Sequence, residues 1–242
     1  MQYHEVKLNI QLATAVDGVS NVDSDLTVQC FVDYVYLDTD ERRRFAQVSH
    51  EYLIQQLQFT GDESVTIASD SRSQNVRLNF NHPTKFLAFV FKGSKHGQYT
   101  AASTADYANI NTYAEALAPL KSAKLQLNGH DRFSERKGSY FNLVTPWQTL
   151  RTRAPAGVYL YSFSLKPDEH QPSGSCNFSR IDNATLSISL KAASAAGTGV
   201  ANVAAEDTTL TAATSLTALK VFAENYNVFR IMSGMGGLAY SN

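Results

Sequence analysis

The sequence lacks the features that mark a nucleic-acid binder, a membrane protein or a disulfide-stabilised secreted domain. Its 21 Lys and Arg residues are matched by 22 Asp and Glu, so it has no basic field that could hold a nucleic acid backbone. The two cysteines, Cys30 and Cys176, provide no disulfide framework and fit synthesis in a reducing compartment. Apolar runs such as residues 86–91 are far shorter than the roughly 20 residues that span a bilayer. We therefore expect no direct binding of nucleic acid and no insertion into a membrane.

Motifs for catalysis and cofactor binding are also missing from the sequence. The six histidines include no His-x-His pair of the cupin type. The nearest group of metal-ligand residue types is residues 168–170, to which His130 and Asp131 could be added. Adjacent residues of an extended chain point to opposite faces, so three in a row rarely bind one ion. The glycines of residues 234–237 are not followed by the helix, Lys and Ser/Thr that a phosphate loop needs. No Gly-x-Ser-x-Gly elbow occurs. The sequence predicts no catalytic residue, no cofactor site and no metal site, and hence no enzyme.

The sequence does contain many short segments in which apolar and polar residues alternate. Alternation with period 2, interrupted by polar residues, Gly or Pro, is typical of an all-β sandwich or barrel. Residues 184–190 are an example, with Ala184, Leu186, Ile188 and Leu190 on one face. We predict eight strands, near residues 53–59, 64–68, 76–80, 86–91, 124–128, 158–165, 184–190 and 219–231. Eight is the number of strands in a jelly roll, so the predicted fold is an all-β, eight-stranded jelly-roll sandwich.

The beginning of the chain does not fit that count. Residues 3–12 and 26–37 read as two further strands, and two strands alone are at best marginally stable. Asp38 is a suitable helix N-cap with Glu41 at the third helical position, which predicts a short helix through residues 42–45. We interpret residues 1–37 as the end of an incomplete first domain and residues 38–52 as a linker. The second domain is then residues 53–242, with an exposed Ala-, Ser-, Thr- and Gly-rich loop at residues 192–218.

Three stretches of sequence together carry a family resemblance. They are TDERRRFAQVSHEYL at residues 39–53, QPSGSCNFSRIDNATLSISL at residues 171–190 and VFAENYNVFRIMSGMGGLAYSN at residues 221–242. In this order they resemble the major capsid protein of the nucleocytoplasmic large DNA viruses, the group that holds the chloroviruses and iridoviruses. Asn177 and Asn183 within the second stretch form N-glycosylation sequons, but we expect a packing and hydrogen-bonding role for them.

The resemblance implies a double jelly-roll shell protein, of which this chain would be the last strands of the first jelly roll and all of the second. It also implies a structural subunit of an icosahedral virion, forming homotrimeric pseudo-hexagonal capsomers that contact neighbouring capsomers and minor capsid proteins. Assembly is expected in the host cytoplasm, close to an inner membrane but without insertion into it. Arg42, Arg43, Arg44 and the C-terminal tail are our candidates for contacts between subunits.

A carbohydrate-binding jelly-roll module is the alternative from another functional class. Aromatic side chains such as Trp147, Tyr159 and Tyr161 could stack on sugar rings. The two tyrosines alternate at strand spacing, however, and we expect them in the core.

Overall fold

The computed structural model describes residues 5–10, 28–65, 73–93, 119–155, 157–190, 193–194, 210–211 and 216–241. The chain divides into two compact units. Unit 1 comprises Met1–Ile54 and Asn227–Asn242, and unit 2 comprises Gln55–Tyr226. The C-terminal residues 227–242, which the sequence analysis places in the second domain, thus group with the first 54 residues.

Strands dominate the described part of the chain. They are β1 His50–Ser64, β2 Ser73–Arg77, β3 Pro83–Gly93, β4 Leu120–Leu127, β5 His130–Asp131, β6 Arg136–Lys137, β7 Val158–Ser162, β8 Cys176–Asn177, β9 Ala184–Leu190, β10 Ala193–Ser194, β11 Leu210–Thr211, β12 Leu216–Met232 and β13 Met235–Leu238. The helices are α1 Thr39–Gln47, the π-helix η2 Tyr140–Val144, α3 Thr145–Leu150 and the 3-10 helix η3 Phe178–Arg180. None of the described helices is long and apolar enough to cross a bilayer.

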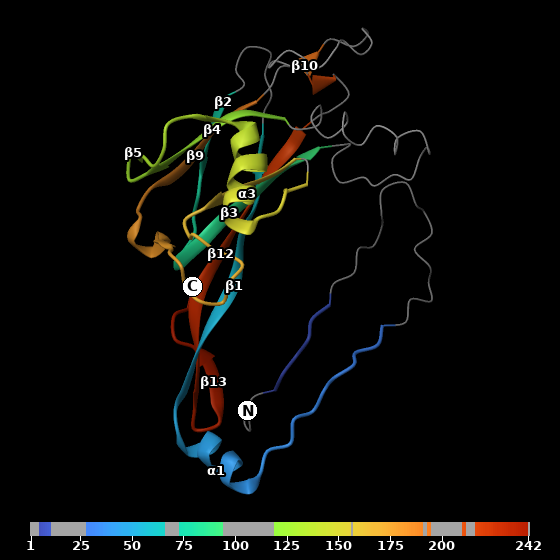
Figure 1. Ribbon diagram of the computed structural model, residues 1–242, viewed down its shortest axis with the longest axis vertical. Coiled ribbons are helices and arrows are strands. Elements are labelled where there is room, and N and C mark those ends of the chain that lie inside the picture. The colour runs from blue at the N-terminus through green and yellow to red at the C-terminus, as the bar shows by residue number, and fades with distance from the viewer. Residues whose placement is uncertain are drawn as a thin grey trace. The chain divides into compact units, whose positions relative to one another are not determined.

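Two sheets hold the main strands. One has the order β1-β12-β3-β7 and the other the order β2-β9-β4-β5, with β6 also paired to β4 (Figure 1). If β5 and β6 are taken as one interrupted strand, the eight main strands follow the orders 1-8-3-6 and 2-7-4-5 in chain sequence. These orders are those of a jelly roll built from two Greek keys. The predicted all-β jelly-roll fold is confirmed.

The core of unit 2 lies between the inner faces of the two sheets. In β9 every second residue from Ala184 to Leu190 is buried, as the alternation in the sequence predicts. β3 is a central strand between β12 and β7, and Phe89 on its inner face is almost fully buried. Phe141 from η2 packs edge-on against Phe89, with ring centroids 5.9 Å apart. The loop before β7 thus closes the core with an aromatic side chain from a helix.

Two strand predictions in unit 2 need correction. No separate strand forms in the described part of residues 64–68, because Ser64 is the last residue of β1 and Val65 follows it without strand pairing; residues 66–68 lie outside the described residues. The eighth strand is supplied by β5 and β6, which are too short to show any period in the sequence. β2 also begins three residues before the predicted segment 76–80 and ends at Arg77.

The described residues of the two early segments, 5–10 and 28–38, contain no strand. Their large apolar side chains are exposed, and Phe31 retains 91% of its accessible surface. A strand needs a neighbour for its backbone hydrogen bonds, and among the described residues none pairs with these segments. The division of the chain at residue 37 therefore stays a prediction.

Most of the predicted loop 192–218 lies outside the described residues. Within it, β10 pairs in parallel with β11, and β12 begins at Leu216, inside the predicted loop. The predicted helix after Asp38 is present as α1, and the side chain of Asp38 accepts a hydrogen bond from the backbone N–H of Thr39 at 2.7 Å. β1 begins at His50, within the predicted linker 38–52.

Candidate assembly surfaces

Helix α1 presents its three arginines to solvent, because none of its residues is buried. Arg43 lies 3.5 Å from Asp40 one turn earlier, an exposed pair that contributes little stability. The carbonyl oxygen of Arg44 accepts a hydrogen bond from the N–H of Val48, which ends the helix. Arg42, Arg43 and Arg44 are thus exposed, and their role in contacts between subunits stays a prediction.

The C-terminal tail folds back as a hairpin on the end of β12. Ser233 and Gly234 both have positive φ, 52° and 78°, the combination that a tight two-residue hairpin turn requires. β13 then pairs with β12 in register from Met232 with Met235 to Phe229 with Leu238. The glycine cluster therefore forms a turn and an edge strand, and the exposed Leu238 adds an apolar side chain to this edge.

A third surface is formed by η2 and α3, in the connection between β6 and β7. Leu143, Val144 and Trp147 are exposed, and Trp147, the single tryptophan of the chain, retains 59% of its surface. Leu143 and Val144 lie four and three residues before Trp147, which are the spacings of neighbouring side chains on a helix surface, so the three side chains form an apolar patch around Trp147. Arg151 and Arg153 follow immediately, both exposed, and neither forms an ion pair with a described residue. The sequence analysis considered Trp147 only as a sugar-stacking residue and did not recognise this patch.

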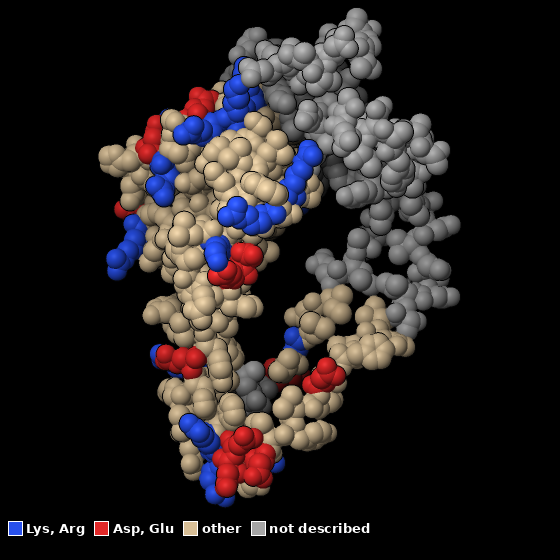
Figure 2. Space-filling view, in the orientation of Figure 1, with Lys and Arg blue, Asp and Glu red and all other residues tan. Residues whose placement is uncertain are grey.

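Charge is distributed unevenly around this patch. Residues 136–166 include five Lys and Arg and no Asp or Glu, although the whole chain has a net charge of −1. Figure 2 shows Lys and Arg side chains around the uncharged surface over α3, with some Asp and Glu side chains further from it. The run without acidic residues is the sequence signal that could have revealed the surface. The patch is therefore apolar at its centre and basic around it.

One ion pair lies in the interior of unit 2. Lys85 in β3 is 1% exposed, and its Nζ lies 3.0 Å from Oε1 of Glu224 in β12, whose side chain is 25% exposed. The same ammonium lies 5.4 Å from the ring centroid of Tyr226. The backbone carbonyl of Lys85 accepts hydrogen bonds from the N–H groups of Phe163 and Ser164. Lys85 thus connects the strand pair β3–β12 to the segment after β7, a role that its sequence context did not reveal.

The tyrosines proposed for sugar stacking belong to the core. Tyr159 has no exposed surface, and its hydroxyl accepts a hydrogen bond from the N–H of Leu120 at 3.2 Å. Burial raises the pKa of the Tyr159 hydroxyl far above its ordinary value, despite the opposing effect of that hydrogen bond. Burial also raises the pKa of the half-buried Tyr161, whose ring packs against Phe133 and Phe163. The Tyr159 ring is therefore not available for stacking on a ligand, and the Tyr161 ring is partly buried against the core.

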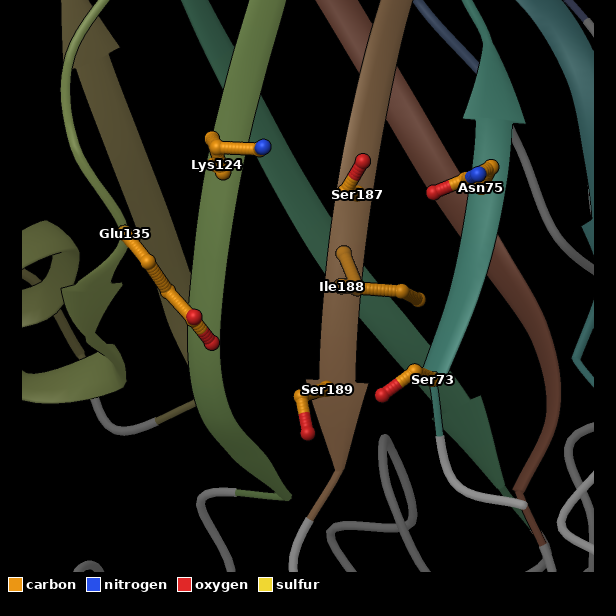
Figure 3. A pocket seen from close by; sticks show the side chains of 7 residues that line it. All are labelled: Ser73, Asn75, Lys124, Glu135, Ser187, Ile188 and Ser189. Atoms are coloured by element: carbon orange, nitrogen blue, oxygen red, sulfur yellow. The ribbon is translucent and has the colours of Figure 1, made fainter. Parts of the chain in front are cut away.

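A shallow pocket of about 160 Å³ lies on the sheet of β2, β9 and β4 (Figure 3). Hydroxyl and amide side chains dominate its lining, together with one Lys and one Glu; the residues are Ser73, Asn75, Lys124, Glu135, Ser187, Ile188 and Ser189. The two charged groups are already engaged, because Lys124 lies 3.2 Å from Asp131 and Glu135 accepts a hydrogen bond from Ser122. With no aromatic ring in its lining, the pocket does not favour the carbohydrate-binding alternative.

The acidic run at residues 168–170 is a turn held by neighbouring side chains. Lys166 Nζ lies 2.6 Å from Glu169 Oε1, and this hydrogen bond raises the pKa of Lys166. Among the described residues, no three His, Cys, Asp or Glu side chains come close enough together to hold a metal ion. In the same stretch of sequence, Asn177 Oδ1 accepts from the N–H of Ser179, whose hydroxyl accepts from the N–H of His82. The sequon side chains at this point thus serve to hold the turn before η3.

Comparisons with known proteins place the chain among viral shell proteins. The family model described as large eukaryotic DNA virus major capsid protein matches residues 41–237. The chain is 55% identical to the major capsid protein of Paramecium bursaria Chlorella virus 1, over 100% of this chain and 62% of the relative. It is 46% identical to that of Pyramimonas orientalis virus, over 100% of this chain and 56% of the relative.

A solved structure extends the similarity to three dimensions. The crystal structure of PBCV-1 VP54, fitted into a cryo-EM reconstruction of the virophage Sputnik, superposes with a TM-score of 0.75 at 57% identity. This match covers 86% of the present chain and 56% of that chain. The chain thus spans less than two thirds of the length of these relatives.

Proposed function

The chain belongs to the family of large eukaryotic DNA virus major capsid proteins, and on that premise we propose that it is part of a structural subunit of an icosahedral virion shell. The observation that carries the proposal is the 55% identity to a major capsid protein across the whole of this chain. The jelly-roll order of the two sheets supports it, because stiff sheets with short edges and variable loops suit a repeated building block. The proposed role is structural and involves no catalysis.

The subunit is proposed to assemble as a homotrimer with a pseudo-hexagonal outline. Such capsomers would contact neighbouring capsomers and minor capsid proteins, and assembly would take place in the host cytoplasm. The net charge of −1 supports close packing, since identical copies with a high charge of one sign would repel one another.

The first 37 residues are proposed to be the last strands of the first, N-terminal jelly roll of the full-length protein. Residues 28–37 include large apolar side chains on both faces of the extended chain, and these are exposed in unit 1. Exposed apolar surface on this scale is typical of a segment that is covered by other parts of an assembly. The remaining length of the relatives is enough to supply that cover, because this chain spans only 62% of the first of them.

The test is the native mass of the full-length protein, measured by light scattering after size exclusion, alongside that of the 242-residue chain. We expect a trimer for the full-length protein and a monomer or aggregate for the shorter chain. Electron microscopy of the trimer peak should show particles with a six-sided outline. A stable monomer for both proteins across the accessible concentration range would contradict the proposal.

A further inference from the structure

The apolar and basic surface over α3 has the composition of a protein interface. Trp and Arg are the residue types most often found at the energetic centres of interfaces. Here Trp147 is flanked by Leu143 and Val144 on the helix and by Arg151 and Arg153 just beyond it. A partner for this surface must offer apolar side chains together with carboxylates.

The same chain contains a segment with the complementary composition. Residues 8–41 include seven Asp and Glu and no Lys, Arg or His. Within the described part of this segment, Phe31 and Val35 are 91% and 84% exposed, and Asp33 lies between them in sequence. The acidic segment and the basic surface are therefore separate parts of one polypeptide with opposite charge.

Strand geometry decides which face of the acidic segment would be free. Successive side chains of an extended chain point to opposite faces, so Phe31, Asp33 and Val35 share one face, while Cys30, Val32 and the tyrosines at 34 and 36 share the other. An unpaired carboxylate is unfavourable in a core. If this segment is a strand of a first jelly roll, the face with Asp33 is the one turned away from that domain's core.

We infer that the α3 surface of one copy binds the Phe31–Asp33–Val35 face of a neighbouring copy. Trp147 and its two apolar neighbours would cover Phe31 and Val35, and the guanidinium groups of Arg151 and Arg153 would pair with Asp33 and the carboxylates that follow it. The contact joins two different patches, so it is heterologous and, when the rotation closes, generates a ring of subunits. This inference rests on the proposed trimer and names the surfaces that hold it together.

The experiment uses the full-length protein with charge reversals on each side. Arg151→Glu with Arg153→Glu should lower the association constant at least tenfold at 0.15 M salt, measured by light scattering over a dilution series. Asp33→Arg alone should weaken association in the same direction. The protein that combines all three changes should associate more strongly than the double arginine variant and more strongly than Asp33→Arg alone, because the charges on the two surfaces are again opposite.

A matched control and a folding check make the result interpretable. Arg77→Glu with Arg180→Glu reverses two exposed arginines elsewhere on unit 2 and should leave association unchanged. The circular dichroism spectrum should match that of the parent protein in every variant; the thermal midpoint is not the folding check, because dissociation alone lowers it. Trp147→Glu serves as a second, independent disruption of the α3 surface.

The outcomes separate this inference from the proposed function. A trimeric parent protein whose α3 reversals and Trp147→Glu variant remain trimeric at the same dilution overturns the inference and leaves the shell function standing. If the charge reversals lower the thermal midpoint of the monomer without changing association, the contact lies within one copy. That result also overturns the inference. A parent protein that stays monomeric at every concentration overturns both.

Discussion

The ion pair between Lys85 and Glu224 predicts an unequal response when either partner is replaced. Lys85 is 1% exposed, whereas Glu224 retains 25% of its side-chain surface. Glu224→Gln would leave the Lys85 ammonium buried without a counter-charge. Removing one partner of a buried pair costs roughly 3–5 kcal/mol, and we expect about 3 kcal/mol here because the Gln carbonyl can still accept a hydrogen bond.

Replacing the lysine should be less damaging. Lys85→Met keeps the apolar stem of the side chain and leaves Glu224 with access to water, so we expect a loss of only about 1 kcal/mol. The double variant should resemble Lys85→Met, since it buries no unpaired charge. The resulting coupling energy of about 2–3 kcal/mol would be the direct measure of the pair.

Urea unfolding at pH 7, followed by circular dichroism, gives these free energies if the slope with denaturant is the same in all variants. Lys124→Met is the control, because Lys124 forms an exposed pair with Asp131 in the other sheet and its loss should change stability little. The reasoning would be refuted if Glu224→Gln changed stability no more than this control. It would also be refuted if Lys85→Met proved the more costly single replacement.

Three further predictions concern the packing of buried residues in unit 2, one of them with a control residue in unit 1. Burial raises the pKa of the Tyr159 hydroxyl above its unfolded value of about 10, so its neutral form contributes stability fully below about pH 10 and less as pH rises further. The free energy of unfolding in urea should therefore fall from about pH 9 to about pH 11, and it should fall less steeply in Tyr159→Phe. Equal declines in the two proteins would contradict this. Gly138→Ala would place a Cβ under 3.0 Å from the backbone carbonyl of Leu120 and should lower the free energy of unfolding by about 2 kcal/mol or more. Gly237→Ala is the control, because its Cβ meets no atom within 4 Å and should leave thermal unfolding nearly unchanged. Leu186→Ala in β9 should lower the free energy of unfolding in urea by roughly 2–5 kcal/mol, and a loss below 1 kcal/mol would show that the sandwich core is not packed there.

Local patterns in the sequence were enough to predict the long strands. Leu186 and Ile188 alternate with polar residues because one side of β9 faces the other sheet, and this period is visible without knowing the partner strand. Strands of two residues, such as β5 and β6, have no period, so their pairing with β4 follows only from the folded structure. The prediction of a separate strand at residues 64–68 was wrong for a different reason: Gly61 and the acidic residues after it suggested a break in the sequence, whereas β1 continues through them to Ser64.

Local sequence patterns could not predict contacts between residues that are distant in the sequence. Lys85 and Glu224 are 139 residues apart, and each alone is an ordinary charged residue in a strand. Trp147 was noticed as an aromatic residue, but its place in an apolar patch depends on the helix that η2 and α3 form. The arginines of α1 are exposed, since the helix contains only one large apolar side chain, Phe45, but their proposed role in contacts between subunits stays a prediction.

The two thiols of the chain differ in exposure, and this difference can be used to test whether residues 28–37 are part of a first jelly roll. Cys30 is exposed on the face it shares with Val32, whereas Cys176 is half-buried against the core and burial raises the pKa of its thiol. An alkylating reagent should therefore modify the present chain first at Cys30. If residues 28–37 are a strand whose Cys30 face lies inside a first jelly roll, the same thiol becomes inaccessible in the full-length protein, and labelling stoichiometry would distinguish a completed subunit from a fragment without any structural measurement.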